Sequence, residues 1–116
     1  MTLAAFMSEL GPLISQLEAA VAAGDSVLAS AGQLFEWRIR ARILQDKLYQ
    51  VAKPPGAAKS GEEIQDVIVA PVFSSKAADQ ARAALPQAGA LRDALQNKRL
   101  KLALDAARAV ERMVIA

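Results

Sequence analysis

The sequence contains no cysteine and no histidine. Without cysteine, the chain can form no disulfide bond and offers neither a thiol nucleophile nor a thiolate metal ligand. Without histidine, it lacks the commonest general base and the commonest ligand of transition metals. Ser-His-Asp, Cys-His and zinc chemistries are therefore excluded within this chain, as is a ferritin-like di-iron site, which needs Glu-x-x-His motifs. The sequence predicts no cofactor, no metal site and no enzymatic activity.

Long apolar runs are also missing. No run approaches the roughly 18 to 20 residues that a membrane-spanning helix needs, and residues 1–17 lack the basic start of a secretory signal. These two absences predict a cytoplasmic protein without a transmembrane segment. The net charge is small too, because a formal net charge of +2 is far below the dense positive charge of a dedicated nucleic-acid-binding protein.

What the chain has in abundance is alanine and leucine. Hydrophobic residues make up 53% of its 116 positions, aromatic residues only 4%, and there are six glycines. This composition favours helices that pack closely through small side chains, and the length suits one domain with a modest core. We therefore expect an all-α fold, an antiparallel bundle of about four principal helices kinked at Gly/Pro sites.

In the first half of the chain, helix signals fall on either side of Gly24. A first helix capped by Thr2 is expected to kink or restart at Gly11-Pro12, and Gly24 is a plausible C-terminal cap. A second, long helix is predicted over 26–53. The Pro/Gly-rich stretch 53–61 is the clear loop, which divides the chain into two helical halves within a single domain.

In the second half, Ser60 and Glu63 fit a capping box that starts a short helix. The apolar segment Val67–Phe73 contains a proline and is expected to be helical to about residue 70 and then extended, lying over the core or forming a partner-binding edge. Ser74 or Ser75 should restart a helix, Pro86 should break or kink it, and a final helix is predicted over 87–115.

The predicted helix over 26–53 is apolar on two opposite sides, and this is the most informative feature of the sequence. A helix at the edge of a small monomer needs only one apolar stripe, so two stripes predict that this helix is sandwiched inside a bundle or between subunits. The first stripe consists of Val27, Leu34, Trp37, Ala41, Leu44, Leu48 and Val51, and the second of Leu28, Phe35, Ile39 and Ile43.

These stripes motivate the leading functional hypothesis, a non-catalytic protein-interaction module that acts by helix packing. An adaptor, an assembly factor or a helical chaperone would fit, bound to itself as a homodimer or to another protein's amphipathic helix. Arg38, Arg40 and Arg42 on the flanks would set the register and the choice of partner. The expected anchors of the interface are Leu34, Phe35, Trp37, Ile39, Ile43, Leu44 and Leu48.

The alternative hypothesis is a helical dimer that binds nucleic acid through a basic strip on the final helix. The strip comprises Lys98, Lys101, Arg108 and Arg112 and is interrupted by Asp105. It extends about 20 Å along the helix and could also meet an acidic partner or an anionic membrane surface, but an ordinary solvated helix face is the simpler interpretation.

Two further patterns are better explained by structure than by function. Gly56 to Gly61 resembles a phosphate-binding loop only faintly, because the second glycine is followed by Glu62-Glu63 rather than by lysine. Glu62, Glu63 and Asp66 could hold a hard cation, but they also fall in the first turn of the predicted short helix, where negative charge is favoured.

Overall fold

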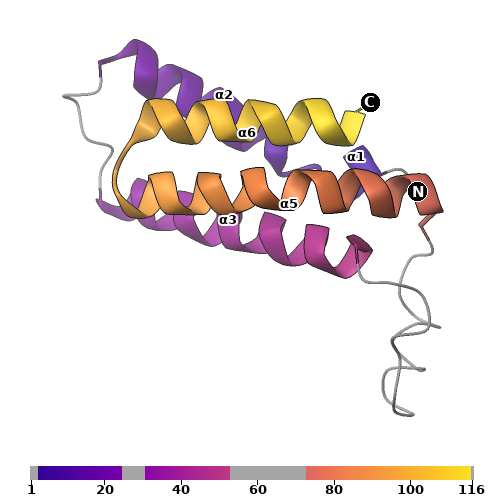
Figure 1. Ribbon diagram of the computed structural model, residues 1–116. Coiled ribbons are helices and arrows are strands. Elements are labelled where there is room, and N and C mark those ends of the chain that lie inside the picture. The colour runs from indigo at the N-terminus through magenta and orange to yellow at the C-terminus, as the bar shows by residue number, and fades with distance from the viewer. Residues whose placement is uncertain (1–2, 25–30, 53–72, 116) are drawn as a thin grey trace.

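The computed structural model describes residues 3–24, 31–52 and 73–115, and every regular element in these ranges is a helix (Figure 1). The long helices run alternately in opposite directions, which confirms the predicted all-α antiparallel bundle. The helices are α1 (Leu3–Phe6), α2 (Leu10–Ala22), α3 (Ala31–Ala52), α5 (Ser75–Gln96) and α6 (Leu100–Ile115).

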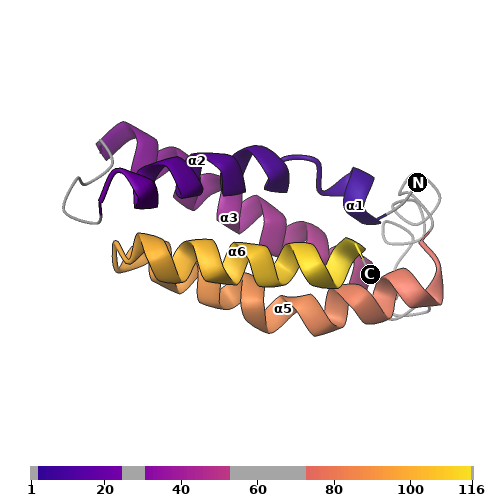
Figure 2. The ribbon, with the colours of Figure 1, turned by 90° about the horizontal axis from the view of Figure 1, so that it is seen from above.

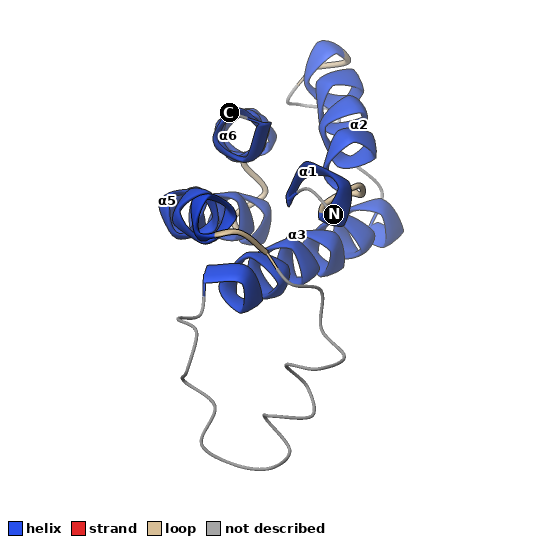
Figure 3. Cartoon of the chain, turned by 90° about the vertical axis from the view of Figure 1, so that its right-hand side faces the viewer, coloured by secondary structure: helices blue, strands red, loops and turns tan. Residues whose placement is uncertain are grey.

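The two halves of the chain are combined into a shared core. α5 packs along both α6 and α3, and α2 lies against α6, whereas α2 and α3 touch each other only over a short stretch. Seen from above, α6 lies between α2 and α5 (Figure 2), and seen from the end, the four long helices surround a common centre (Figure 3). α3 therefore lies at the edge of the bundle with one face turned away from it.

The core consists of leucines, alanines and the single tryptophan. Trp37 is fully buried, and its indole Nε1 donates a hydrogen bond of 2.7 Å to Gln16 Oε1 of α2. Alanines at 77, 81, 84 and 88 of α5 allow its neighbours to approach closely. In the part of the chain that the structure describes, no polar or charged side chain is buried.

The start of α2 shows how a proline can be accommodated. The chain turns at residues 7–9, α2 begins at Leu10, and Gly11 and Pro12 lie in its first turn. A proline there removes no helical hydrogen bond, because the first N–H groups of a helix have no partner within it. The expected restart thus lies just before Gly11-Pro12, and Gly24, with a φ of 102°, follows the last turn as predicted.

The prediction that a final helix begins at about residue 87, after a break at Pro86, is wrong. α5 continues through Pro86 to Gln96, and the break lies at Asn97–Arg99. Pro86 is exposed, so its ring projects into solvent and the helix loses only local hydrogen bonding. α5 ends instead in a Schellman turn, in which Lys98 N–H donates to Leu95 O (3.2 Å) and Arg99 N–H donates to Ala94 O (2.8 Å).

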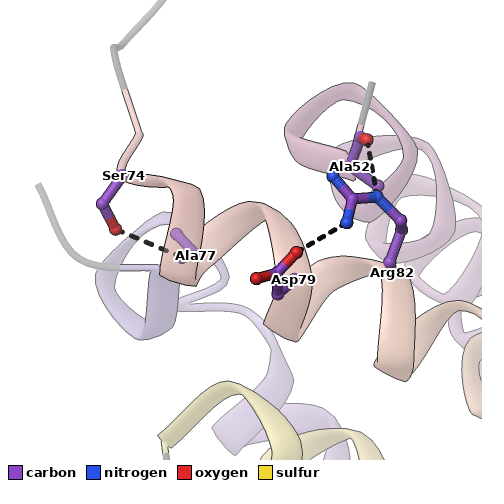
Figure 4. A network of polar contacts seen from close by, with 5 residues as sticks. All are labelled: Ala52, Ser74, Ala77, Asp79 and Arg82. Carbon is purple, nitrogen blue, oxygen red and sulfur yellow. Dashed lines mark hydrogen bonds and ion pairs between the residues drawn. The ribbon is translucent and has the colours of Figure 1, made fainter. Parts of the chain in front are cut away.

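Two arginines join the antiparallel helices α3 and α5 at their ends. Arg38 of α3 donates to the carbonyls of Leu95 and Gln96 at the C-terminus of α5, at 3.2 and 3.1 Å. Arg82 of α5 donates to the carbonyl of Ala52, the last residue of α3, at 3.4 Å (Figure 4). Each helix thus satisfies carbonyls at the other's C-terminus, where positive charge is also favoured.

The start of α5 follows the sequence prediction. Ser74 is its N-cap, and the hydroxyl accepts a 3.2 Å hydrogen bond from Ala77 N–H (Figure 4). Phe73, just before the cap, packs edge to face on Phe6 with ring centroids 5.1 Å apart, which fixes the entry of the chain into α5. Several features predicted from the sequence lie outside the described residues: Thr2, the loop 53–61, Ser60, Glu62, Glu63, Asp66 and residues 67–72.

Candidate protein-interaction surface

The first apolar stripe of α3 is part of the chain's own core. The structure therefore places four of the seven expected anchors where only the same chain can contact them. Leu34, Trp37, Leu44 and Leu48 are at most 8% exposed. Trp37 is at 0% and is consequently unable to stack on a base or to insert into a partner.

The second stripe is at the surface. Phe35, Ile39 and Ile43 are 64%, 44% and 43% exposed, and we call these three residues the outer ridge. Leu28, which the sequence placed in the same stripe, lies outside the described residues. Because scattered single apolar residues on a surface are ordinary whereas a row is not, the outer ridge is the strongest candidate for a docking surface.

The spacing of the outer ridge defines its direction. Its members are separated by four residues each, so the ridge rises about 12 Å along the helix and drifts about 40° around it with each step. A partner helix that touches all three must therefore cross α3 obliquely, as in packing of i±4 ridges at about 50°.

A charged row lies on each side of the outer ridge. On one side Glu36 and Arg40 form an ion pair of 2.7 Å. On the other side Arg42 and Asp46 are both exposed, and neither has an ion-pair partner within the described residues. Each row combines one cation with one anion, so the surface as a whole is neutral.

The remaining basic residues of α3 are used inside the chain. Lys47 Nζ donates to Phe6 O at 3.0 Å and lies 5.0 Å from the centroid of the Phe6 ring. It also forms an ion pair with Glu9, in which Nζ lies 2.8 Å from Oε1. Since Arg38 is bound to α5, the basic residues Arg38, Arg40, Arg42 and Lys47, which flank Trp37 in the sequence, form no phosphate-binding patch.

The basic strip of the final helix is less uniform than the sequence suggested. Lys98 lies in the turn before α6, with a φ of 59°, while Lys101, Arg108 and Arg112 are exposed on α6. Arg108 pairs with Glu18 of α2 at 3.2 Å, and the exposed Asp105 lies in the same strip. The field of the strip is therefore partly neutralised.

An open groove of about 620 Å³ runs between α5 and α6. Alanines form much of its lining, together with the exposed Leu102, and acidic and basic side chains share its rim. Its charged members are Asp93, Arg99, Asp105 and Arg112. Because the charges alternate in sign, the groove shows no preference for an anionic or a cationic ligand.

Two exposed apolar residues were missed in the sequence. Tyr49 is 64% exposed and Leu102 is 52% exposed. In the sequence, Leu102 falls at the edge of the apolar positions of the final helix, and only this edge position could have signalled its exposure. Neither residue has an apolar neighbour four positions away in the exposed part of its helix, so neither extends a ridge.

The described residues contain no group of three or more acidic side chains that could hold a metal ion. Among the helices of the same part of the chain, none is long and apolar enough to cross a bilayer. No protein-family model, curated protein or solved structure matches this chain. A functional assignment must therefore come from the residues and the fold.

Proposed function

We propose that the chain is a non-catalytic protein-interaction module that acts in the cytoplasm and docks a helix on the outer ridge of α3. The observation that carries the proposal is that α3 is buried along its inner face and still presents Phe35, Ile39 and Ile43 to solvent. Within the described residues, α3 packs on the bundle through its inner face, and the outer ridge is not part of the core.

Burial of the outer ridge supplies the driving force of this proposal. Removing apolar surface from water contributes about 25 cal/mol per Å², and exposed large apolar side chains in a row provide such surface without unfolding any element. The charged rows beside the ridge would orient the partner, since complementary charges mainly determine specificity and association rate.

Site-specific photocrosslinking in the cells that make the protein tests the proposal. A benzoylphenylalanine at position 35, which retains the aromatic character of Phe35, should form an adduct with a protein that docks on the ridge. The same group at position 102, on α6, is the matched control, because Leu102 is also exposed but belongs to no ridge. A protein adduct at 35 and none at 102 is the expected result. Equal labelling at both positions, or none at either, would contradict the proposal.

Nucleic-acid binding by the strip of α6 receives no comparable support. The pair between Arg108 and Glu18 and the carboxylate of Asp105 reduce the positive charge available for phosphate contacts.

A further inference from the structure

We propose that the partner on the outer ridge is a second copy of this chain, related by a two-fold axis that runs along the ridge. The inference rests on the proposed function, because it assumes that the ridge docks a helix. In this arrangement Phe35, Ile39 and Ile43 each lie opposite the same residue of the partner, so all three exposed side chains of both copies become covered.

The spacing of the ridge supports this geometry. Rows of residues four apart are inclined by about 26° to the helix axis. When two copies place these rows parallel to each other, their helix axes cross at about 50°, the commonest class of helix packing in globular proteins. α3 lies at the edge of the bundle, and its outer face is turned away from the other described helices (Figure 3).

Charge complementarity selects the second copy over other partners. The two-fold axis exchanges the sides of the ridge, so the row of Glu36 and Arg40 faces the partner's row of Arg42 and Asp46. At 100° and 1.5 Å per residue and with the ridge inclined by about 26°, Glu36 and Arg42 differ by about 4 Å along the ridge, as do Arg40 and Asp46, an offset that the long arginine side chains can span. Glu36 thus meets the partner's Arg42, Arg40 meets the partner's Asp46, and symmetry forms each pair twice.

The opposite orientation lacks this match. A two-fold axis through Ile39 and perpendicular to the ridge keeps each row on its own side. Glu36 then faces the partner's Glu36 and Arg42 faces the partner's Arg42, which places like charges together. Arg42, which is exposed and has no ion-pair partner among the described residues, therefore meets an opposite charge in the first orientation and a like charge in the second.

A charge-exchange experiment tests whether a second copy binds there. Glu36 and Arg42 lie on opposite sides of the ridge in one chain, so they interact only between copies. Arg42→Glu alone and Glu36→Arg alone should each raise the dimer dissociation constant about tenfold or more, measured by sedimentation equilibrium. An equimolar mixture of the two variants should regain the wild-type mass, because every interchain pair is again opposite in charge. Lys76→Glu, a charge reversal on the exposed start of α5, is the control and should leave the mass unchanged.

Cysteine crosslinking tests the orientation. Because the chain has no native cysteine, a disulfide can form only through the introduced residue. On mild oxidation, each single-cysteine variant should form a disulfide-linked dimer without being mixed with another variant. The variants are Phe35→Cys, Ile39→Cys and Ile43→Cys. If only Ile39→Cys crosslinks alone and the other two need to be mixed, the proposed axis is wrong, since equivalent residues would then be about 12 Å apart.

A wild-type chain that stays monomeric, with no crosslink at any of the three positions, would overturn the second copy as partner. The proposed function is judged separately, by whether position 35 yields a photoadduct with any protein, this chain included. An adduct with another copy of this chain supports both proposals, and an adduct with another protein alone supports only the first.

Discussion

Lys98 has the least favourable backbone conformation among the described residues. Its φ of 59° is in the left-handed region, where a Cβ atom crowds the following carbonyl and costs about 1 to 2 kcal/mol. The Schellman hydrogen bonds at the end of α5 require this conformation at that residue, and glycine is the usual occupant. Lysine therefore weakens a turn whose position determines where α6 begins.

Replacing Lys98 by glycine should stabilise the protein. We expect Lys98→Gly to raise the free energy of unfolding by about 1 kcal/mol, because the left-handed conformation then costs little. Lys101→Gly is the matched control. It makes the same chemical change within α6 and should lower the free energy by up to about 1 kcal/mol. Urea denaturation followed by circular dichroism measures both. Destabilisation of similar size in both variants would show that Lys98 contributes something beyond its backbone conformation.

At the scale of single elements, the two arginines that join α3 to α5 act in opposite directions along an antiparallel pair. Arg38 holds the C-terminus of α5, and Arg82 holds the C-terminus of α3. The sequence assigned Arg38 to the flank of an interface, because helical periodicity gives the direction of a side chain but not its partner. Whether it meets solvent or a carbonyl depends on where the neighbouring helix ends.

Loss of Arg38 should therefore destabilise the fold more than loss of Arg42. We expect Arg38→Ala to cost about 1 kcal/mol, at the low end for hydrogen bonds from a charged donor because the side chain is partly exposed. Arg42→Ala should stay within about 0.5 kcal/mol. Thermal unfolding at a low protein concentration compares the two without a contribution from assembly. Equal effects would argue against the joining role of Arg38.

Pro86 gives a second prediction for an element. Since α5 continues through it, Pro86→Ala should restore a helical N–H donor and stabilise the protein by about 1 to 3 kcal/mol, less the rigidity that proline gives the unfolded chain. Pro12→Ala, in the first turn of α2, should change stability by less than about 1 kcal/mol. A loss of stability in Pro86→Ala would indicate that the ring makes a packing contribution larger than its helical penalty.

At the scale of the whole molecule, the sequence predicted the architecture better than the site. The all-α bundle, the Ser74 cap and the Gly24 terminus follow from local signals that each residue carries by itself. The two apolar stripes of α3 were visible too, but periodicity alone could not tell that Leu34, Trp37, Leu44 and Leu48 face the core while Phe35, Ile39 and Ile43 face solvent. That distinction depends on which side α5 and α2 occupy, which is a property of the assembled bundle.

Assembly through the outer ridge should make stability depend on concentration. A ligand that binds only the folded state stabilises it by mass action, and here the ligand is another copy. The midpoint of thermal unfolding should rise by about a few degrees for each tenfold increase in wild-type concentration above the dissociation constant. Ile39→Glu should remove this dependence and leave the low-concentration midpoint nearly unchanged. A midpoint of the wild type that is independent of concentration over the micromolar to millimolar range would argue against self-association.

The placement of the only tryptophan has a practical consequence for optical experiments. Trp37 is sealed in the core against Gln16, roughly opposite Ile39 on the same helix. Its intrinsic fluorescence will respond when the bundle opens and will be nearly silent when something docks on the outer ridge. The emission spectrum should therefore stay constant on mixing with a partner, whether or not the partner binds. A label placed on the ridge itself is needed to distinguish the two outcomes.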